Sequence, residues 1–469
     1  MATRNTSNLS VLMLPWLAHG HISPYLDLAK KLSTRNFNIF LCSTPINLES
    51  VKNKVTGKWS ESIQLVELNL PPSPDLPPHY HTTNGLPPHL MGSLKTAFAD
   101  SSANFLTIFE SVKPDMLIYD YNQSWAADIA LSNNIPAVQF LLSSAIFSSL
   151  RRQMLYSDSS VTYPFPISIH KYFTEKMKAR LKSSPDDAKY IDRARGASKK
   201  SRVILLRISR EIEGKYVDYI SNLSQKKTIP VGSLVQESLQ ETGDDCTETI
   251  QFLDKKDKSS VVFVSFGSEY FLKRKIQEVA YGLELSRLNF IWVIRFPFGE
   301  NIKIEEALPI GFLDRVGDRG LVVEGWAPHA RILHHSSTGG FISHCGWSSM
   351  MESMMFGVQV IAMPMHIDQP FNTVVVKEVG VGQEVERDED VRFKREEISK
   401  VIRNVVIEKS GETVRRKAKE MREMIREKGE KEIDEVVGGA RKLLQGEERQ
   451  SYIFHNVIVV QKIVKNLGR

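Results

Sequence analysis

Short apolar runs alternate with amphipathic helical patterns through most of the chain. Apolar runs of this kind are typical of strands buried on both faces, and their alternation with helices predicts an α/β protein with parallel sheets. We therefore expect strands at residues 11–14, 37–42, 116–119, 137–142 and 203–206 in the first half, and at residues 261–266, 290–294, 321–324, 340–343 and 360–363 in the second half.

The length of the chain indicates more than one domain. A chain of 469 residues is longer than one hydrophobic core usually organises. An acidic, turn-prone stretch between the two groups of strands is the natural boundary. We predict a first domain over 1–232, a linker over 233–256, a second domain over 257–448, and an apolar tail over 449–469 that packs back on the first domain.

Composition excludes several classes of protein. Hydrophobic residues make up 42% and charged residues 25% of the chain, and the net charge of +6 is spread along it, so no nucleic-acid partner is expected. The apolar run 11–17 is too short to cross a bilayer, and we expect no integral membrane association. Cys42, Cys246 and Cys345 are too sparse for a disulfide framework, which favours a reducing, cytoplasmic location.

The most informative segment of the second half is a predicted strand, a short turn and a helix. The turn contains His344 and Gly346 and lies between the strand 340–343 and a helix over 350–356. Glycine lets backbone N–H groups approach a ligand, and a helix N-terminus carries about half a positive charge. The order therefore favours a diphosphate site.

Polar residues at the start of this helix fit such a site. Ser348 and Ser349 are N-cap or first-turn residues whose hydroxyls can donate to phosphate oxygens. Glu352 follows about one turn later, where a carboxylate can accept both hydroxyls of a ribose.

Each of these features also has an ordinary structural explanation. A strand, a glycine and a helix occur in any doubly wound fold. The spacing of His344 and Cys345 relative to the nearby His334 and His335 matches no usual zinc pattern, so we expect no metal. Cys345 is more typical of a small buried side chain than of a nucleophile.

The whole segment is more specific than its parts. From Trp326 to Gln369 it spans 44 residues and includes WAPHARILHH, GFISHCGWSS and the later Asp368-Gln369. It resembles the 44-residue signature of plant UDP-dependent glycosyltransferases, and the resemblance extends over essentially the whole chain. It implies the GT-B fold, in which two Rossmann-like, doubly wound parallel-sheet domains face each other across a cleft and the second holds the donor.

The resemblance also implies roles for individual residues in binding the nucleotide. Trp326 would stack on uracil, and the backbone of Ala327 would pair with it. Glu352 would bind the ribose. His344 and Ser349 would hold the diphosphate.

Other positions of the family pattern contact the sugar or the phosphates. Trp347, Asp368 and Gln369 would contact the sugar, and Gln369 is similar to glucose-using members. Ser268, after the predicted strand 261–266, resembles the family's phosphate-side hydroxyl.

The chain departs from the pattern at two of these donor positions. His329 stands where the family usually has glutamine, and Ser348 where it usually has asparagine, although serine also occurs there. Both lie beside nucleotide or phosphate, so we expect an altered donor affinity and an unchanged binding mode.

Two polar groups follow predicted strands of the first half. His19-Gly20-His21 comes after the strand 11–14, and Asp120 comes directly after the strand 116–119. Both should lie at the carboxyl edge of the sheet, where ligands of such folds bind. A histidine there can act as a general base, although a structural histidine and a turn aspartate are the ordinary alternatives.

The family pattern chooses between these histidines. It places its catalytic histidine directly after the glycine, which is His21, and it pairs that histidine with the aspartate at Asp120. Ser23 and Pro24, just after His21, fit the N-cap and first residue of a helix over 24–32.

The implied reaction is a displacement at the anomeric carbon with inversion. His21 would deprotonate an acceptor hydroxyl, Asp120 would stabilise the imidazolium, and UDP would leave. No metal or other cofactor is required, UDP-glucose being a co-substrate, and a monomer is expected. The segments 76–91 and 266–271 look like the branch that adds sugars to terpenoid, steroid or flavonoid glycosides.

Three other functions compete with this interpretation. A glucosyltransferase could act directly on aglycones. A non-catalytic binder of UDP-sugars or glycosides could keep the fold, although both His21 and Asp120 are present. A nicotinamide-dependent oxidoreductase predicts a glycine fingerprint after the first strand, where this chain has a single glycine between two histidines.

Overall fold

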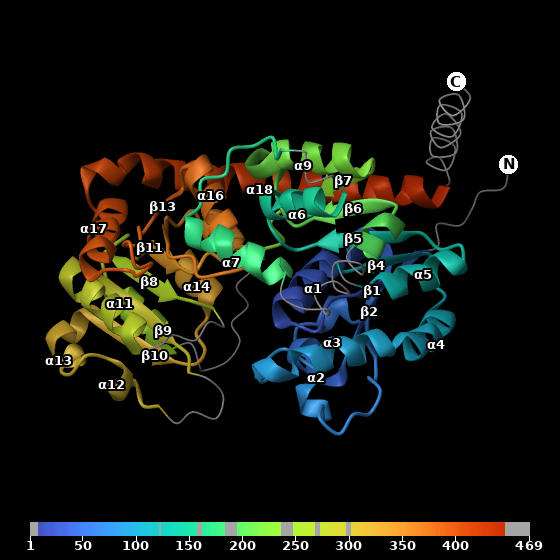
Figure 1. Ribbon diagram of the computed structural model, residues 1–469, viewed down its shortest axis with the longest axis horizontal. Helices are drawn as coiled ribbons and strands as arrows, with labels where there is room; N and C mark the ends of the chain where they lie inside the picture. Colours follow the sequence, from blue (N-terminus) through green and yellow to red (C-terminus); the bar gives the residue numbers. More distant parts are fainter. Residues whose placement is uncertain are drawn as a thin grey trace.

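The structure is a computed structural model, and it describes residues 8–121, 123–156, 162–182, 195–235, 247–267, 273–296 and 302–445. It contains two sheets that lie side by side in two lobes, blue to green and yellow to red in Figure 1. All strand pairs of both sheets are parallel, as the apolar runs predict.

The first sheet has seven strands in the order β3-β2-β1-β4-β5-β6-β7. Its strands are β1 (Leu9–Leu14), β2 (Phe37–Ser43), β3 (Ile63–Glu67), β4 (Met116–Tyr119), β5 (Ala137–Leu141), β6 (Val203–Leu206) and β7 (Lys227–Pro230). The helices of this half are α1 (His19–Ser33), α2 (Pro45–Lys52), α3 (Met91–Asp100), α4 (Ser102–Val112), α5 (Ser124–Ser132), α6 (Ala145–Tyr156), α7 (Lys171–Lys182) and α9 (Arg210–Ser224).

The second sheet has six strands in the order β10-β9-β8-β11-β12-β13. Its strands are β8 (Val261–Ser265), β9 (Asn289–Ile294), β10 (Gly320–Glu324), β11 (Thr338–Ser343), β12 (Val360–Ala362) and β13 (Gly382–Glu384). The helices of this half are α10 (Thr247–Asp254), α11 (Lys273–Ser286), α12 (Ile304–Ala307), α13 (Phe312–Val316), α14 (His329–His334), α15 (Trp347–Phe356), α16 (Gln369–Val379), α17 (Arg395–Val406) and α18 (Glu412–Gln445).

The central strands are apolar throughout because helices cover both faces of each sheet. In β1, Val11 and Met13 belong to the core on one face, together with residues of α1. Leu12 and Leu14 belong to the core on the other face, together with residues of α3, α4 and α5. Successive side chains of a strand point to opposite faces, so both sets are buried at once.

The two halves share a continuous core rather than a thin linker. The cluster that contains Phe263 and Phe341 of the second sheet also contains Leu206 and Tyr216 of the first half. The hydroxyl of Tyr216 in α9 donates to the Glu378 carboxylate in α16, with an O···O distance of 3.0 Å. Helix packing and this polar contact therefore tie the lobes together.

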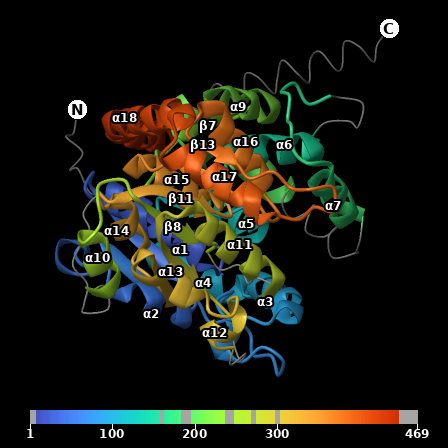
Figure 2. The ribbon, with the colours of Figure 1, turned by 90° about the vertical axis from the view of Figure 1, so that its left-hand side faces the viewer.

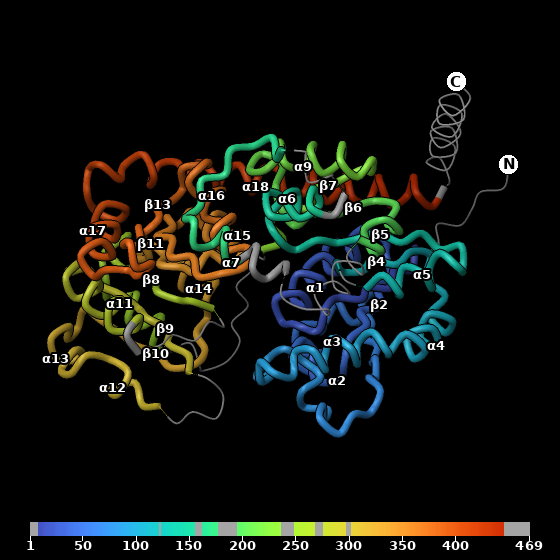
Figure 3. Tube along the Cα trace, viewed as in Figure 1, coloured from blue at the N-terminus to red at the C-terminus, as the bar shows by residue number. Residues whose placement is uncertain are grey.

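Helix α18, the last of the described part, crosses from one lobe to the other along the upper side of the molecule in Figures 1 and 3. Ala418 and Met421 pack in the core cluster that includes α15, whereas Ile433 and Val436 pack against the first sheet. In the view turned by 90°, α18 and α9 lie at one end and α2 and α12 at the other (Figure 2).

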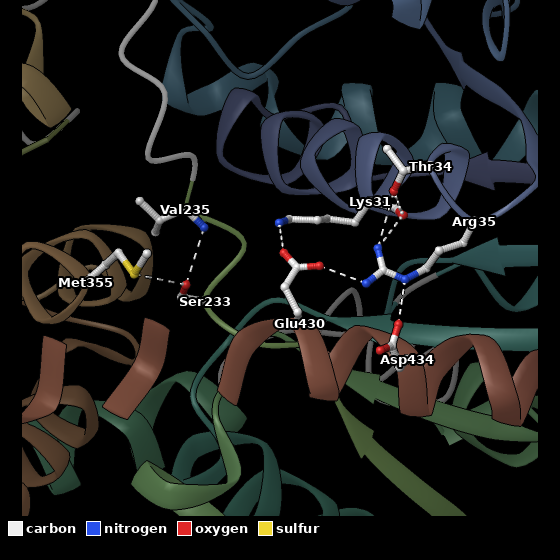
Figure 4. A network of polar contacts seen from close by, with 8 residues as sticks. All are labelled: Lys31, Thr34, Arg35, Ser233, Val235, Met355, Glu430 and Asp434. Carbon is white, nitrogen blue, oxygen red and sulfur yellow. Dashed lines mark hydrogen bonds and ion pairs between the residues drawn. The ribbon is translucent and has the colours of Figure 1, made fainter. Parts of the chain in front are cut away.

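Ion pairs connect the C-terminal half of α18 to α1 (Figure 4). Glu430 accepts from Lys31 and, at 2.8 Å, from Arg35 Nη2. Arg35 Nε also donates to Asp434 at 2.8 Å. Helix α18 lies within the predicted second domain by sequence, but its last turns pack on the first sheet.

Helix α1 begins earlier than the sequence indicates. We expected Ser23 and Pro24 to be the N-cap and first residue, which was wrong: the helix starts at His19, with Ala18 at the N-cap, and Pro24 lies inside it. Pro24 is the sixth residue of this helix, so it removes one i→i−4 hydrogen bond, the one that would run to the carbonyl of Gly20. His21 therefore sits in the first turn of α1 rather than in a loop.

Three short strands escaped prediction: β3, β7 and β13. In β3 and β13 most residues are partly exposed, and β7 begins with an exposed lysine, so none reads as a buried apolar run. The predicted linker includes α10, and the predicted tail 449–469 lies outside the described residues. No helix of the described part is long and apolar enough to cross a membrane.

Candidate active site

The predicted site residues of both halves lie at the switch points of their sheets. In the first sheet the strand order reverses between β1 and β4, and in the second between β8 and β11. Connections leave a switch point toward opposite faces, which opens a crevice at the carboxyl ends of the strands. His21 follows β1 and Asp120 follows β4, while Gly267 follows β8 and His344 follows β11.

His21 and Asp120 form a hydrogen-bonded pair. His21 Nδ1 lies 2.6 Å from Asp120 Oδ2, and the carboxylate is fully buried whereas the imidazole is 26% exposed. Asp120 also accepts from the backbone N–H of Trp16 at 3.1 Å and of Tyr121 at 2.7 Å. An ionised carboxylate only accepts, so this network places the proton on Nδ1 and leaves Nε2 as an acceptor.

The two lobes meet at this pair. Burial raises the pKa of Asp368, in the loop before α16, and a hydrogen bond from Asn372 and the charge of His21 oppose that shift. His19 is partly desolvated by neighbouring protein atoms, and this desolvation lowers its pKa. The positive charges of Lys54 and Arg295 lower the pKa of His19 further. Histidines of the first lobe thus lie within electrostatic range of Asp368 and Arg295 of the second.

The turn after β11 holds the His344 ring between two glycines. A Cβ on Gly267 would lie 2.8 Å from Cε1 of His344, and one on Gly346 would lie 2.6 Å from its Nε2. Gly267 also has a φ of +63°, and Cys345 has a φ of +66°. The sequence folds this way locally because only glycine allows both close approaches. His344 is 8% exposed and its position is tightly fixed.

Helix α15 begins where a diphosphate site was expected. Gly346 is its N-cap, so Ser348 and Ser349 lie in the first turn and Glu352 one turn further on. The helix begins at Trp347, three residues before the predicted start at residue 350, and it ends as predicted before Gly357, which has a φ of +70°. The first backbone N–H groups of α15 have no intrahelical acceptor and can bind an anion.

Glu352 is paired with His329 at the start of α14. Nδ1 of His329 lies 2.9 Å from Oε2 of Glu352, and each side chain is about one quarter exposed. The His329 ring also packs edge-on against Phe263 and Phe341. Trp326, just before α14, is 61% exposed, so one face of its indole is accessible to a ligand.

Asp368 and Gln369 are held by the turn that precedes α16. The amide oxygen of Gln369 accepts from the backbone N–H groups of Met365 at 2.8 Å and His366 at 3.0 Å. Asn372 donates to Asp368 Oδ2 at 2.9 Å and to the carbonyl oxygen of Cys345 at 2.8 Å. The carboxylate of Asp368 is therefore fixed beside the His344 turn.

The side chain of Trp347 is buried between the lobes. It is only 4% exposed, and its indole N–H donates to the backbone carbonyl of Arg207 at 2.8 Å. Ala327 is likewise 6% exposed. Ser268 lies outside the described residues.

Sequence reasoning missed three residues at the junction of the lobes. Ser144, after β5, donates to the Asn372 amide oxygen at 2.6 Å, and both side chains are fully buried. Arg207, after β6, donates to Ser348 Oγ at 2.7 Å. Ser144 and Arg207 lie shortly after two predicted strands, which was the only available signal for them, and Asn372, inside α16, had none.

Groups of acidic, histidine and cysteine side chains do not form a metal site in the described part of the chain. Asp388 pairs with Lys394, and Asp390 pairs with Arg392.

Comparison with known protein families finds a match for each half of the chain. Residues 7–236 match the sequence model of the glycosyltransferase N-terminal domain, and residues 232–414 match that of UDP-glucoronosyl and UDP-glucosyl transferases.

Three curated plant proteins are similar over nearly their whole length. UDP-glucosyltransferase 29 of Panax ginseng is 54% identical, covering 92% of this chain and 95% of its own. The beta-D-glucosyl crocetin beta-1,6-glucosyltransferase of Gardenia jasminoides is 50% identical, with coverages of 90% and 96%. A mogroside IIIx synthase of Siraitia grosvenorii is 49% identical, with coverages of 95% and 95%.

Solved structures share the fold. UGT73P12 of Glycyrrhiza uralensis, complexed with glycyrrhetinic acid 3-O-monoglucuronide, matches with a TM-score of 0.80 at 22% identity, covering 97% of this chain and 99% of that one. A UGT transferase of Siraitia grosvenorii in complex with UDP matches with a TM-score of 0.75 at 24% identity, with coverages of 92% and 100%. The chain therefore belongs to the UDP-glycosyltransferase family, and its two parallel α/β lobes form the GT-B fold.

Proposed function

We propose that this protein is an inverting, metal-independent glucosyltransferase that moves glucose from UDP-glucose to a hydroxyl of a sugar on a small-molecule glycoside. The observation that carries the proposal is the His21–Asp120 pair, with 2.6 Å between Nδ1 and Oδ2, at the edge that faces the second lobe. An imidazole oriented by a buried carboxylate is the arrangement that activates hydroxyl nucleophiles.

The role of each partner follows from the hydrogen bonds. With its Nδ1 proton donated to Asp120, His21 presents Nε2 to the acceptor hydroxyl and takes its proton as the new bond forms. The resulting imidazolium lies against the buried Asp120 carboxylate, which stabilises its charge. The base thus becomes charged only beside a fixed counter-charge.

The second lobe supplies the opposite end of the displacement. Its groups are the N-terminus of α15, with Ser349, and the fixed ring of His344. N–H groups and a histidine there would stabilise the negative charge that develops on departing UDP. A single displacement at the anomeric carbon, with base and leaving group on opposite sides, inverts the configuration.

Specific contacts support glucose as the transferred sugar. The amide oxygen of Gln369 accepts from two backbone N–H groups, which holds this side chain next to Asp368. Asp368 beside it can accept from a sugar hydroxyl. The Panax ginseng and Gardenia jasminoides relatives are named as glucosyltransferases.

The acceptor class is supported by relatives and not by geometry. The Gardenia jasminoides protein is named for a glucosyl crocetin acceptor, and the Siraitia grosvenorii protein for a mogroside product. At about 50% identity over nearly the whole chain, a glycoside acceptor is the natural expectation for this protein as well.

The test is a product assay with UDP-glucose and a mixed panel of glycosides and their aglycones, read by mass spectrometry, with wild type compared with His21→Ala. We expect one added hexose on glycosides, a beta linkage by the anomeric proton coupling, full activity in EDTA, and no product from His21→Ala. Wild-type transfer that persists in the variant contradicts the mechanism. Products from aglycones alone contradict the acceptor class.

A further inference from the structure

Arg207 is buried at the point where the two lobes meet. It follows β6 and is 3% exposed. Its backbone N–H donates to the carbonyl of Leu141 at 3.0 Å, and its own carbonyl accepts from the Trp347 indole at 2.8 Å. The backbone of Arg207 is therefore held by groups of both lobes.

The guanidinium group has only neutral partners. Nε donates to the backbone carbonyl of Ser233 at 3.0 Å, and Nη1 donates to Ser348 Oγ at 2.7 Å. Among the ion pairs of the described residues, none includes Arg207. A guanidinium carries five N–H donors, so most of them have no acceptor among the described residues.

Burial of such a cation is expensive. An unpaired charge taken out of water costs several kcal/mol unless an opposite charge compensates it. Desolvation accordingly lowers the pKa of Arg207, while the charges of Asp27 and Glu352 act from beyond ion-pair distance to raise it. In Arg35, by contrast, direct bonds to Glu430 and Asp434 outweigh burial, and its pKa is raised.

The guanidinium points into the first turn of α15. Ser348, its partner, is the second residue of that helix, and the backbone N–H groups around it have no intrahelical acceptors. A buried unpaired cation and a helix N-terminus are two independent features that favour an anion at one place. Glu352, whose charge also reaches Arg207, lies one turn beyond.

We infer that Arg207 binds the diphosphate of the nucleotide sugar, so that the first lobe contributes a fixed positive charge to the leaving group held by the second. This rests on the proposed function and goes beyond it by naming a further diphosphate-binding residue. Serine at position 348, being short, gives the guanidinium access to the helix N-terminus. Arg207 then replaces part of the charge that a metal ion would supply.

The competing explanation is that Arg207 only ties the lobes together through Ser233 and Ser348. A structural tie would affect every ligand of the second lobe alike. A diphosphate contact affects UDP and leaves uridine, which lacks phosphate, unchanged. The difference in affinity between UDP and uridine therefore separates the two explanations.

The experiment is calorimetric titration of UDP and of uridine into wild type, Arg207→Met, Arg207→Lys and Arg202→Met. Arg202 is a matched control because it is exposed and precedes the opposite end of the same strand, β6. We expect Arg207→Met to weaken UDP about 10- to 100-fold, with uridine unchanged, because hydrogen bonds to charged groups are worth ~1.5–3 kcal/mol. Arg207→Lys should recover part of the loss, and Arg202→Met should show none.

Each remaining outcome has one meaning. Equal weakening of UDP and uridine, or unchanged UDP binding, overturns the inference. If Arg207→Met fails to melt cooperatively, the ratio of UDP to uridine affinity in Arg207→Lys decides instead, and an unchanged ratio overturns it. Wild type that binds UDP but transfers no glucose refutes the proposed function and leaves the diphosphate contact intact. Wild type that binds no UDP overturns both.

Discussion

His329 Nδ1 lies 2.9 Å from Glu352 Oε2, so a residue at the start of α14 orients the carboxylate on α15 that is proposed to bind the ribose. His329→Ala should raise the KM for UDP-glucose about fivefold with kcat nearly unchanged, since one hydrogen bond is worth ~1 kcal/mol. His329→Gln can still donate to Glu352 and should recover most of the affinity. Steady-state kinetics with varied UDP-glucose checks this, and a loss confined to kcat would contradict it.

Asp120 fixes which nitrogen of His21 carries the proton. Asp120→Asn should lower kcat roughly 10²- to 10⁴-fold, because an amide can donate to Nδ1 and thus favours the wrong tautomer for a base at Nε2. UDP affinity should stay unchanged, since Asp120 belongs to the first lobe. Single-turnover kinetics and UDP titration measure the two quantities separately. A variant with weaker UDP binding and intact chemistry would sink this assignment.

The His344 ring is confined by Gly267. Gly267→Ala places a Cβ 2.8 Å from the ring and should raise the KM for UDP-glucose. Gly57→Ala is the matched control, because Gly57 has a similar φ of +58° and no neighbouring atom within 4 Å. Both variants should lose about 1–2 kcal/mol of stability from the left-handed backbone, but only the first should lose donor affinity. Equal kinetics in the two variants would refute the role of the close contact.

Glu213 should make stability depend on pH. Its fully buried carboxylate accepts from the backbone N–H groups of Ala145 and Ile146, both at 2.9 Å, and burial raises its pKa from 4.5 to about 7. The unfolded chain loses this proton at lower pH than the folded one, so the stabilising contribution is full below pH 4.5 and is lost as pH rises through 7. The difference corresponds to ~3 kcal/mol.

Glu213→Gln removes this contribution while it keeps an uncharged side chain of the same shape. We subtract the melting temperature of wild type from that of the variant at each pH. This difference should be larger at pH 8 than at pH 5. Glu432, whose pKa burial also raises to about 7, titrates in the same window, so some slope should persist in the variant. A melting difference that stays constant between pH 5 and pH 8 would contradict the role of Glu213.

The ion pairs between α18 and α1 should matter little for activity. Arg35→Met removes the bonds to Glu430 and Asp434, whose side chains are 59% and 67% exposed. Exposed pairs of this kind are worth at most about 1 kcal/mol, and salt weakens them further. Urea denaturation should therefore show a small loss, and turnover should equal that of wild type. A loss above ~3 kcal/mol would mean that the pairs hold the helix in place.

Sequence patterns predicted the parallel α/β fold because the central strands are apolar on both faces. All ten predicted strands are present, with ends shifted by at most two residues. Strands β3, β7 and β13 escaped because edge or short strands are partly exposed and lose the apolar pattern. The start of α1 was misplaced because a serine followed by proline is typical of a helix start, whereas here Pro24 lies inside the helix.

The sequence predicted which candidate residues lie near one another where one short segment supplies several of them. The order of strand, turn and helix places His344 to Glu352 together, and strand ends place His21 near Asp120. Contacts between lobes have no such local signal. Arg207 and Ser348 lie 141 positions apart, and only the packing of two sheets brings them together.

Helix α18 also limits how the two lobes can move. It is one helix of 34 residues, about 50 Å long, and its two ends are buried in different cores. Bending such a helix breaks backbone hydrogen bonds, so separating the sheets by translation would be costly. Helix α18 therefore adds a rigid connection to the core that the lobes share, and a movement that parts the two sheets has to disrupt both.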